Sequence, residues 1–538
     1  CTTGSVTGLK PPVPGKLNVC NLERVSPFHP VLNLIMSIPR IVLLATSLVV
    51  APTLLSAEER EIPPAFGPHI NLTAADFADS TSFTLNDRIV GTYYFYWYDI
   101  GTRAHILNAD GTDALTTHPP TLEDFSYRSV RWYQQQLRDM EAAGIDVVLP
   151  VFWGAPSEHS PQAVQHWSYA GLPPLVQARE ALLREGRNPP RLGLFYDTST
   201  LRHNGWGYHA DLTTDYGRRW FYATVRDFFS CIPPRHWAML DNQPIVLLYA
   251  AAFAKKWDQS VLAYTKQAFP KEFGGRVPWI APQDSWGIEG DNTCYWGGAL
   301  RFRNPGIGEI GPGYDHAAVP GRTPLVRDRQ GGKFYEDSWR RFLRRPTHFV
   351  MIETWNEFHE GTDIAESREY GRQYIELTRQ YADCFKQGKA PAWPPDTFYT
   401  ARAVTASADR PHAKDGLQLV QPADGRAVWR MLAERRCWQT QPTRATRPRY
   451  LYFIVDDSFK WADLMDAVLE VEYFDAAPGR LSVEYDGSDT NAPVRGAYTR
   501  SARVPLTGDQ QWKSATFSLP AARFLNSQNS DADFRFNA

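Results

Sequence analysis

Short apolar runs alternate with longer segments of helical period between residues 85 and 388. Val130, Tyr133, Leu137 and Met140 recur at three- and four-residue steps, as on one face of a helix. The apolar runs are rich in β-branched and aromatic residues, which is typical of buried strands. They are IVGTYYFYW (89–97), DVVLPVFW (146–153), RLGLFYD (191–197), PIVLLYA (244–250), PWIAPQD (278–284), TCYWGGA (293–299), GEIGPGY (308–314) and HFVMIETW (348–355). This pattern predicts an α/β fold, a (β/α)8 TIM barrel over residues 85–388.

The pattern changes after residue 388. Residues 389–412 are rich in proline at their start and predict a linker. Residues 413–538 contain runs such as RYLYFIVDD and AVLEVEYFD, which alternate apolar and polar positions between Asp, Gly, Pro and Asn turns. This alternation predicts an antiparallel β-sandwich domain. The abrupt end at DADFRFNA is compatible with a sandwich that lacks its last strand.

The N-terminal region has the layout of a secretory signal. MSIPRIVLLATSLVVAPTLLSA (36–57) combines a positive charge at Arg40, an apolar run and small residues at its end. The run is too short to cross a hydrocarbon core of roughly 30 Å comfortably. We therefore expect cleavage after Ala57 and a secreted or periplasmic protein with no membrane anchor. Residues 1–35 are expected to be non-native sequence upstream of Met36, and residues 58–84 to lead into the barrel.

Composition narrows the partners and cofactors. The chain has 57 Lys and Arg against 59 Asp and Glu, a formal net charge of −2, so nucleic acid is not an expected partner. Aromatic residues make up 13% of the chain, and their rings can fill cores or stack on sugar rings. No required cofactor or metal is predicted, because the histidines His316, His348 and His359 form no compact ligand set. The cysteines that follow the signal are scattered and lack the spacing of a zinc site: Cys231, Cys294, Cys384 and Cys437. An oxidising compartment permits up to two disulfides, but isolated thiols are favoured.

In a parallel barrel the functional residues gather where the strands end. Aromatic and acidic residues stand at most of the predicted strand ends, and those we expect to bind substrate are Tyr94, Trp97, Trp153, Asp197, Tyr249, Trp286 and Trp296. Rings offer flat apolar faces to sugars, and acids accept hydrogen bonds from sugar hydroxyls. Each ring taken singly could equally pack in the core. Together they predict a cleft that binds a polysaccharide or an oligosaccharide.

The last strand ends in TWNEFHEG (354–361), which places Glu357 and Glu360 three residues apart. Two neighbouring carboxyl groups cannot both ionise at low cost, so one can stay protonated while the other is charged. Cleavage of a glycosidic bond needs such an acid and base pair. Asn356 and His359 are placed to orient the acids or contact the substrate. The alternative is that Glu360 only favours the N-terminus of a helix near residue 366, which would leave Glu357 unexplained.

Three of these stretches carry a resemblance. VGTYYFYWYD, GIDVVLPVFWG and TWNEFHEGTDIAES resemble the first-, second- and last-strand motifs of glycoside hydrolase family 99 and related barrels, which include endo-α-mannosidases. The chain looks most like an uncharacterised bacterial subgroup with a C-terminal β-sandwich, and the similarity covers roughly residues 85 to 388. It implies that Glu357 assists the 2-hydroxyl of the sugar as an internal nucleophile, and that Glu360 protonates the leaving oxygen and later activates water, with retention.

The resemblance also implies that Trp153, Tyr94 and Tyr249 line the subsite beside the cleaved bond. The family usually has Pro at the place of Tyr96 and Gln at the place of Asp363. Because these differences bear on sugar specificity, mannan is not transferred as the substrate.

The sequence thus predicts a secreted glycoside hydrolase that acts within a polysaccharide. One alternative is a non-catalytic carbohydrate-binding protein that uses the same aromatic cleft, and another is a structural surface protein whose rings all lie in the core. The sandwich tryptophans are either a carbohydrate platform or core residues: Trp429, Trp438, Trp461 and Trp512. Asp456 and Asp457 suggest a structural calcium ion in that domain.

Overall fold

The computed structural model describes residues 16–25, 60–154, 166–322, 325–344, 346–389, 398, 401–410, 415–441, 450–460, 464–489, 491–494 and 496–537. The chain divides into two compact units. Thr46–Pro391 is called the parallel-sheet unit here, and Cys1–Ala45 with Ala392–Ala538 the two-sheet unit. The expected signal at 36–57, Trp461 and most of the Pro-rich start of the expected linker lie outside the described residues.

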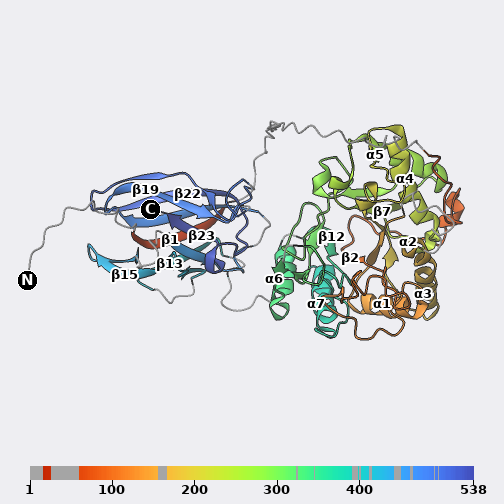
Figure 1. The fold of residues 1–538 in the computed structure, drawn as a ribbon, viewed down its shortest axis with the longest axis horizontal. Helices are drawn as coiled ribbons and strands as arrows, with labels where there is room; N and C mark the ends of the chain where they lie inside the picture. The colour runs from red at the N-terminus through yellow and green to blue at the C-terminus, as the bar shows by residue number, and fades with distance from the viewer. Residues whose placement is uncertain are drawn as a thin grey trace, which may run out of the picture. The chain divides into compact units, whose positions relative to one another are not determined.

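A mainly parallel sheet forms the centre of the parallel-sheet unit (Figure 1). Its hydrogen-bonded ladder runs in the order β8, β7, β5, β3, β2, β12, β9, with β4 also paired to β3 and the antiparallel β6 paired to β7. The strands are β2 (Ile89–Tyr94), β3 (Val147–Phe152), β4 (Arg191–Leu192), β5 (Leu194–Tyr196), β6 (Met239–Leu240), β7 (Gln243–Leu248), β8 (Trp279–Pro282), β9 (Gly308–Ile310) and β12 (Phe349–Ile352). A separate two-stranded hairpin joins β10 (Tyr314–Asp315) and β11 (Val326–Arg327).

The prediction of a strand at 293–299 is wrong. This stretch makes only an isolated parallel bridge, between Cys294 and Gln283, and in the described part of the chain no ladder joins β8 to β9. Gly297 and Gly298 instead donate their backbone N–H groups to Oε2 of Glu353, at 2.6 and 2.8 Å. Gly297 has a φ of 122°, which an extended residue with a side chain rarely adopts. The Gly-Gly pair therefore turns the chain where the apolar pattern suggested a strand.

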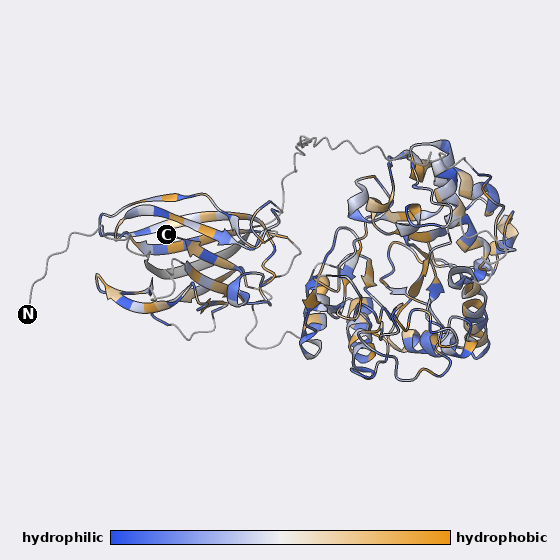
Figure 2. Ribbon diagram, viewed as in Figure 1, coloured by the Kyte–Doolittle hydropathy of each residue, from blue (hydrophilic) through white to orange (hydrophobic). Residues whose placement is uncertain are grey.

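Helices lie around the outside of the sheet (Figure 1). They are α1 (Val130–Ala142), α2 (Trp167–Ala170), α3 (Leu172–Arg184), α4 (Asp215–Ser230), α5 (Ser260–Glu272), α6 (Lys333–Arg344) and α7 (Gln373–Gln387). Helix α1 shows why the sequence folds this way. Ser129 caps its first turn by accepting a hydrogen bond from the backbone of Trp132, and the predicted face residues Leu137 and Met140 are fully buried. Figure 2 shows hydrophilic and hydrophobic residues side by side along these helices, as expected of elements that cover a buried sheet.

Two antiparallel sheets make up the second unit. One has the order β15, β16, β1, β18, β22 with β13 beside β1, and the other the order β14, β17, β23, β19, β20 with β21 beside β19. A single hydrophobic cluster draws on both, for example Leu469 and Phe517 from the first sheet and Phe453 and Phe536 from the second. The strands are β1 (Lys16–Val25), β13 (Ala403–Ser407), β14 (Leu417–Val420), β15 (Ala427–Leu432), β16 (Arg435–Thr440), β17 (Tyr450–Val455), β18 (Met465–Phe474), β19 (Pro478–Tyr485), β20 (Thr499–Arg500), β21 (Val504–Thr507), β22 (Trp512–Ala522) and β23 (Phe534–Asn537).

Strand β1 lies within residues 1–35, which were predicted from the sequence to be non-native and upstream of Met36. Its backbone pairs with β13, β16 and β18, in the middle of the first sheet. No periodic signal predicted this strand, because its ten residues mix charged, polar and apolar types. Over the part of the chain that the structure describes, no helix has the length and apolar character needed to cross a bilayer.

Candidate active site

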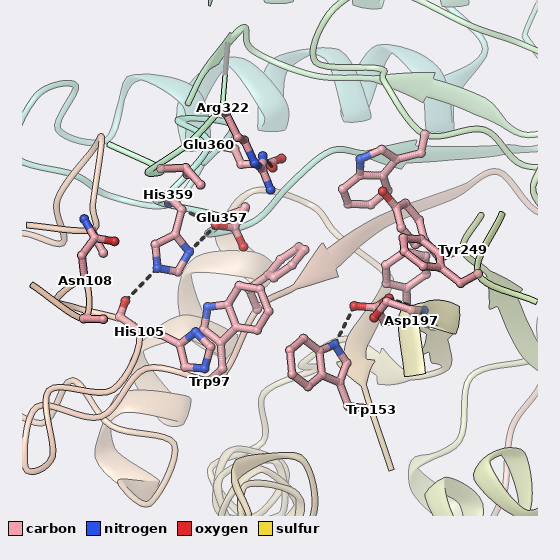
Figure 3. Close-up of a pocket in the computed structure, with 18 of the residues that line it drawn as sticks. Trp97, His105, Asn108, Trp153, Asp197, Tyr249, Arg322, Glu357, His359 and Glu360 are labelled. Carbon is pink, nitrogen blue, oxygen red and sulfur yellow. Dashed lines mark hydrogen bonds and ion pairs between the residues drawn. The ribbon is translucent and has the colours of Figure 1, made fainter. Parts of the chain in front are cut away.

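A cavity of about 630 Å³ lies where the parallel strands end. The residues that line it follow different strands: Trp97 comes after β2, Trp153 after β3, Asp197 after β5, and Glu357 after β12. Figure 3 shows their side chains converging on one space. The lining residues are Phe95, Trp97, His105, Leu107, Asn108, Ala109, Ala114, Trp153, Phe195, Asp197, Ser199, Tyr249, Phe253, Trp296, Val319, Arg322, Glu357, His359 and Glu360. This arrangement explains how residues more than 200 positions apart in the sequence reach one site.

Eight of the side chains proposed from the sequence line the cavity. They are Trp97, Trp153, Asp197, Tyr249, Trp296, Glu357, His359 and Glu360. Tyr94, Trp286 and Asn356 do not. The strand-end pattern selects residues near the rim, but it does not determine which way each side chain points.

Tyr94 and Trp286 are core residues, which corrects the prediction that they contact substrate. Tyr94 is fully buried, with its ring 5.7 Å from that of Trp132 on helix α1. Strand side chains alternate between the two faces of a sheet, so Tyr94 points to the helices. Trp286 is 2% exposed and donates its Nε1–H to the backbone oxygen of Tyr249, at 2.5 Å. It therefore helps to position Tyr249, which lines the cavity.

Asn356 joins two strand ends and does not reach the cavity. Its Oδ1 accepts a hydrogen bond from the Phe95 backbone N–H at 2.8 Å, and its Nδ2 donates to the Phe95 backbone oxygen at 2.7 Å. These two bonds engage both ends of the buried amide. Asn356 thus fixes the end of β2 against the loop that carries the acids, instead of binding substrate as predicted.

Glu357 is held by the histidine two residues later. Its Oε1 lies 2.7 Å from Nδ1 of His359 and also accepts the backbone N–H of that residue at 3.1 Å. The other ring nitrogen of His359 lies 2.8 Å from the backbone oxygen of His105 (Figure 3). A carbonyl oxygen can only accept, so Nε2 of His359 carries a proton, and Nδ1 shares a second proton with Glu357.

The electrostatics of this pair follow from its burial. Burial raises the pKa of Glu357, although His359 beside it acts in the opposite direction. Burial alone would lower the pKa of His359, but the Glu357 carboxylate raises it overall. Oε2 of Glu357 is buried without a hydrogen-bond partner, and the side chain faces the cavity. Glu357 is thus a desolvated carboxyl group with one oxygen available to a bound molecule.

Glu360 has a different partner. Its Oε1 forms an ion pair with Nη1 of Arg322, and its side chain is 18% exposed. Its backbone oxygen accepts the N–H of Asp315 at 2.9 Å, which ties the loop to β10. No helix begins near residue 366, since α7 starts at Gln373, so the alternative role of Glu360 in a helix N-terminus is wrong. The sequence predicted that the two acids share a proton mainly with each other, whereas each has a cationic partner of its own.

A buried ion pair supports the loop that follows the acids. Arg329 donates to Oδ1 of Asp363 at 2.8 Å and to the backbone oxygens of Asp363 and Gly361, both at 2.9 Å. Thr117 also hydrogen-bonds to Asp363. Asp363 is fully buried and does not line the cavity. The difference from the family pattern at this position therefore changes the support of the loop and not the cavity wall.

Aromatic rings form two parts of the wall. Trp97 stacks on His105, with ring centroids 4.6 Å apart and planes 5° apart. Trp296 stacks on Phe195 and meets Tyr249 edge to face, with centroids 5.4 Å apart in both pairs. Parallel and edge-on rings of this kind present apolar faces of the size of a sugar ring.

Between these two parts, Trp153 donates its Nε1–H to Oδ2 of Asp197 at 2.5 Å. Burial raises the pKa of Asp197, so the wall contains a second buried carboxyl group beside Glu357.

Several lining residues escaped the sequence analysis. Arg322, His105 and Asn108 lie in loops with no strand-end or motif signal. Phe195 belongs to β5, and its place inside an apolar strand favours a core residue. A search for basic residues near the motif would not have selected Arg322, because it stands 38 positions before Glu360.

The remaining metal and cysteine candidates have ordinary surroundings. Within the described ranges, no group of three or more His, Cys, Asp and Glu side chains is placed to hold a metal ion. Asp456 accepts hydrogen bonds from Ser458, and Asp457 pairs with Lys460. Cys231, Cys294, Cys384 and Cys437 are free thiols, as the sequence favoured.

Comparison with known proteins places the chain in a family. Residues 94–392 match the family described as "Domain of unknown function (DUF5010)", and the chain belongs to it. Curated relatives that match are named endo-alpha-1,2-mannosidases or endo-alpha-1,2-mannosidase-like proteins. The glycoprotein endo-alpha-1,2-mannosidase-like proteins of Mus musculus and Homo sapiens are both 34% identical to it over 98 residues, 15% of this chain. The matched part spans only 22% and 21% of these two relatives.

Among solved structures, the chain is similar to the GH99 endo-alpha-mannosidase from Bacteroides thetaiotaomicron. The TM-score is 0.39 at 15% sequence identity, over 57% of this chain and 99% of that one. A bacterial fucosidase gives a TM-score of 0.34 at 10% identity, over 73% of this chain and 100% of that one. Likeness at this level does not identify a reaction, because one fold supports many chemistries.

Proposed function

We propose that the chain is a glycoside hydrolase that cleaves within a polysaccharide and retains the configuration of the sugar. The observation that carries the proposal is that Glu357 and Glu360 line one cavity walled by aromatic rings, each beside a different cationic partner. Two carboxyl groups in unlike surroundings can take unlike roles in acid–base catalysis. The cavity is also large enough for sugar rings, which favours a carbohydrate over a small metabolite.

In the first step, Glu357 takes the proton of the 2-hydroxyl of the sugar, as the resemblance to family 99 implies. The 2-oxygen then attacks the anomeric carbon and closes a three-membered ring. The bond to the leaving oxygen breaks, and Glu360 gives that oxygen a proton. In the second step, Glu360 takes a proton from water, which attacks the anomeric carbon and opens the three-membered ring, while Glu357 returns the proton to the 2-oxygen. Two inversions at the same carbon give retention.

The surroundings of the acids suit these roles. His359 lies against Glu357 and can stabilise its carboxylate before it takes the hydroxyl proton. Glu360 can give a proton only when its carboxyl group is free of Arg322, so we propose that substrate entry opens this ion pair. Trp153 and Tyr249 line the cavity, and we propose that they contact the sugar beside the cleaved bond.

Further parts of the sequence prediction remain proposals. The parallel sheet with its outer helices supports a (β/α)8 barrel in which residues 293–299 take the place of the sixth strand, and the two antiparallel sheets support a β-sandwich. We keep the signal at 36–57 and a secreted or periplasmic location as proposals.

The test is to incubate the purified chain with a panel of polysaccharides, α-mannans and α-glucans included, and to measure new reducing ends. We expect release from at least one, and loss of release with retained binding in Glu357→Gln and Glu360→Gln. A wild-type chain that binds a glycan but releases no sugar over days would instead support the non-catalytic carbohydrate-binding protein. Absence of both binding and release across a broad glycan array would favour the structural protein.

A further inference from the structure

A small basic pocket lies on the second sheet of the two-sheet unit, in a different unit from the candidate active site. It has a volume of about 170 Å³ and is lined by Arg480, Ser482, Arg500, Ser501, Arg503 and Asn537. The whole chain has a formal net charge of −2, so three arginines around one pocket are a local concentration of positive charge.

The pocket follows from strand periodicity. Along β19, Leu481, Val483 and Tyr485 are buried in the shared core, so Arg480 and Ser482 point to the outer face. Ser482 is paired in register with Asn537 of β23. On the other side of β19, Arg500 of β20 stands opposite Glu484. The register of three strands therefore brings the donors together.

Part of this positive charge has no acidic partner. Arg500 donates its Nε–H to Oε1 of Glu484 at 3.1 Å, and the same carboxylate is shared with Arg535, whose Nε–H donates to Oε2 at 2.6 Å. Arg480 and Arg503 are exposed and form no ion pair with any described residue. The pocket thus combines one guanidinium group that shares its acid with Arg535 and two that have no acid beside them.

The chemistry of the lining selects the ligand. Guanidinium groups bind carboxylate and sulfate oxygens through paired N–H donors, and they keep their charge at any physiological pH. Ser482 and Asn537 add a hydroxyl and an amide, which suit sugar hydroxyls. Three arginines in so small a pocket fit a single anionic group better than the long backbone of a nucleic acid, which needs an extended basic surface.

We propose that this pocket binds the anionic substituent of an acidic polysaccharide, a carboxylate or a sulfate group. The proposal does not rest on the reaction in the other unit, because none of the six lining residues belongs to the candidate active site. Its effect would be to hold the chain on a charged glycan.

The experiment measures binding of the full chain to dextran sulfate, polygalacturonate and neutral dextran by affinity electrophoresis and calorimetry. We expect binding to at least one of the two acidic polymers and none to neutral dextran. Binding to dextran sulfate indicates a site for sulfate, and binding to polygalacturonate indicates a site for carboxylate. The double variant Arg480→Ala, Arg503→Ala should have an affinity for that polymer at least about tenfold lower than the wild type, since two charge-assisted contacts are lost. Arg480→Lys, Arg503→Lys should lie between, because the charge remains but the fork of donors is lost.

Arg430→Ala is the matched control, since Arg430 is an exposed arginine on β15 in the other sheet. It should bind like the wild type, and all variants should melt at the wild-type temperature because the altered side chains are exposed. Arg322→Ala shows whether the polymer binds in the active-site cavity or in this pocket. It should leave binding to the acidic polymer unchanged. The proposal is overturned if the double variant binds like the wild type, if Arg322→Ala loses the binding, or if duplex DNA of equal charge competes as well as the polysaccharide.

Discussion

Polar groups gather by different routes in the two units. In the parallel-sheet unit, Trp97, Trp153 and Glu357 follow three strands that run in the same direction, so distant parts of the sequence meet at one edge. In the two-sheet unit, Arg480 and Ser482 are two residues apart on one strand, and Asn537 joins them by register. The first route depends on topology, and the second on the period of a strand.

The two routes also give different chemistry. Glu357 is 3% exposed and pairs with a histidine, whereas Arg480 and Arg503 lie on the surface and have no acidic partner in the structure as described. Buried groups have altered proton affinity, which a reaction requires. Exposed charges attract ions of the opposite sign from solution. Under the two proposals, the first unit carries the reaction and the second holds the glycan.

The largest effect is expected at the two acids. Glu357→Gln and Glu360→Gln should each lower kcat/KM on the polysaccharide by about 10²–10⁴-fold, because each removes a group that moves a proton. Glu360→Gln should lose far less on a glycosyl fluoride, whose leaving group needs little protonation, whereas Glu357→Gln should lose activity on both substrates. Glu376→Gln, an exposed residue of α7, is the control. Equal losses on both substrates in the two variants would contradict the separate roles.

The next effect concerns the loop that carries the acids. Arg329→Leu leaves the buried carboxylate of Asp363 without its cation, so the free energy of unfolding should fall by about 3–5 kcal/mol. Urea unfolding of the full chain measures this loss. The exposed Arg131→Leu serves as the control. A variant as stable as the wild type would show that the loop has another support.

His359→Ala should lower kcat/KM by about 10–100-fold, as is usual when the partner of a functional group is removed. The sign of the pH effect follows from the pair: His359 lowers the pKa of Glu357, so its loss lets burial raise that pKa further. The rise of kcat/KM with pH, which requires ionised Glu357, should therefore move to higher pH. His209→Ala, at an exposed histidine, should leave the profile in place. An unmoved profile in His359→Ala would mean that the residue has only a packing role.

Asp533 tests whether a raised carboxyl pKa is by itself enough to indicate a reactive site. It is buried in the two-sheet unit beside Lys460, and burial raises its pKa to about 6. Because this value exceeds that of the unfolded chain, the native state binds the extra proton between about pH 4 and 6, and stability falls as pH rises through that window. Asp533→Asn should remove this fall, which is about 3 kcal/mol. Unfolding followed from pH 4 to 7 measures it, and catalytic activity should not change.

The smallest effect is expected at Trp429, whose side chain is 56% exposed on β15. Trp429→Ala should change the free energy of unfolding by less than about 0.5 kcal/mol, as for other surface positions. Trp438→Ala, in the core of the same hairpin, should cost about 3–5 kcal/mol. Comparable losses in thermal unfolding would show that Trp429 is part of the core.

The fold was predictable to the extent that strands are apolar and helices amphipathic. The prediction was wrong at 293–299, where Gly297 and Gly298 turn the chain and bind Glu353 by their N–H groups. Apolar content cannot reveal this, because the choice between a ladder and a side-chain acceptor depends on a residue more than 50 positions away. β1 was missed for a similar reason, since its pairing partners supply the context that its own sequence lacks.

The sequence by itself determined the acid pair Glu357 and Glu360, the aromatic character of the strand ends and the change from a 3.6-residue to a two-residue period between the units, because all of these are local patterns. Only the tertiary structure decided the partners: His359 for Glu357, Arg322 for Glu360, and Phe95 for Asn356. It also decided that Tyr94 and Trp286 face the core. The reason is that the direction of a side chain depends on which face of the sheet it leaves and on what the rest of the chain packs against that face.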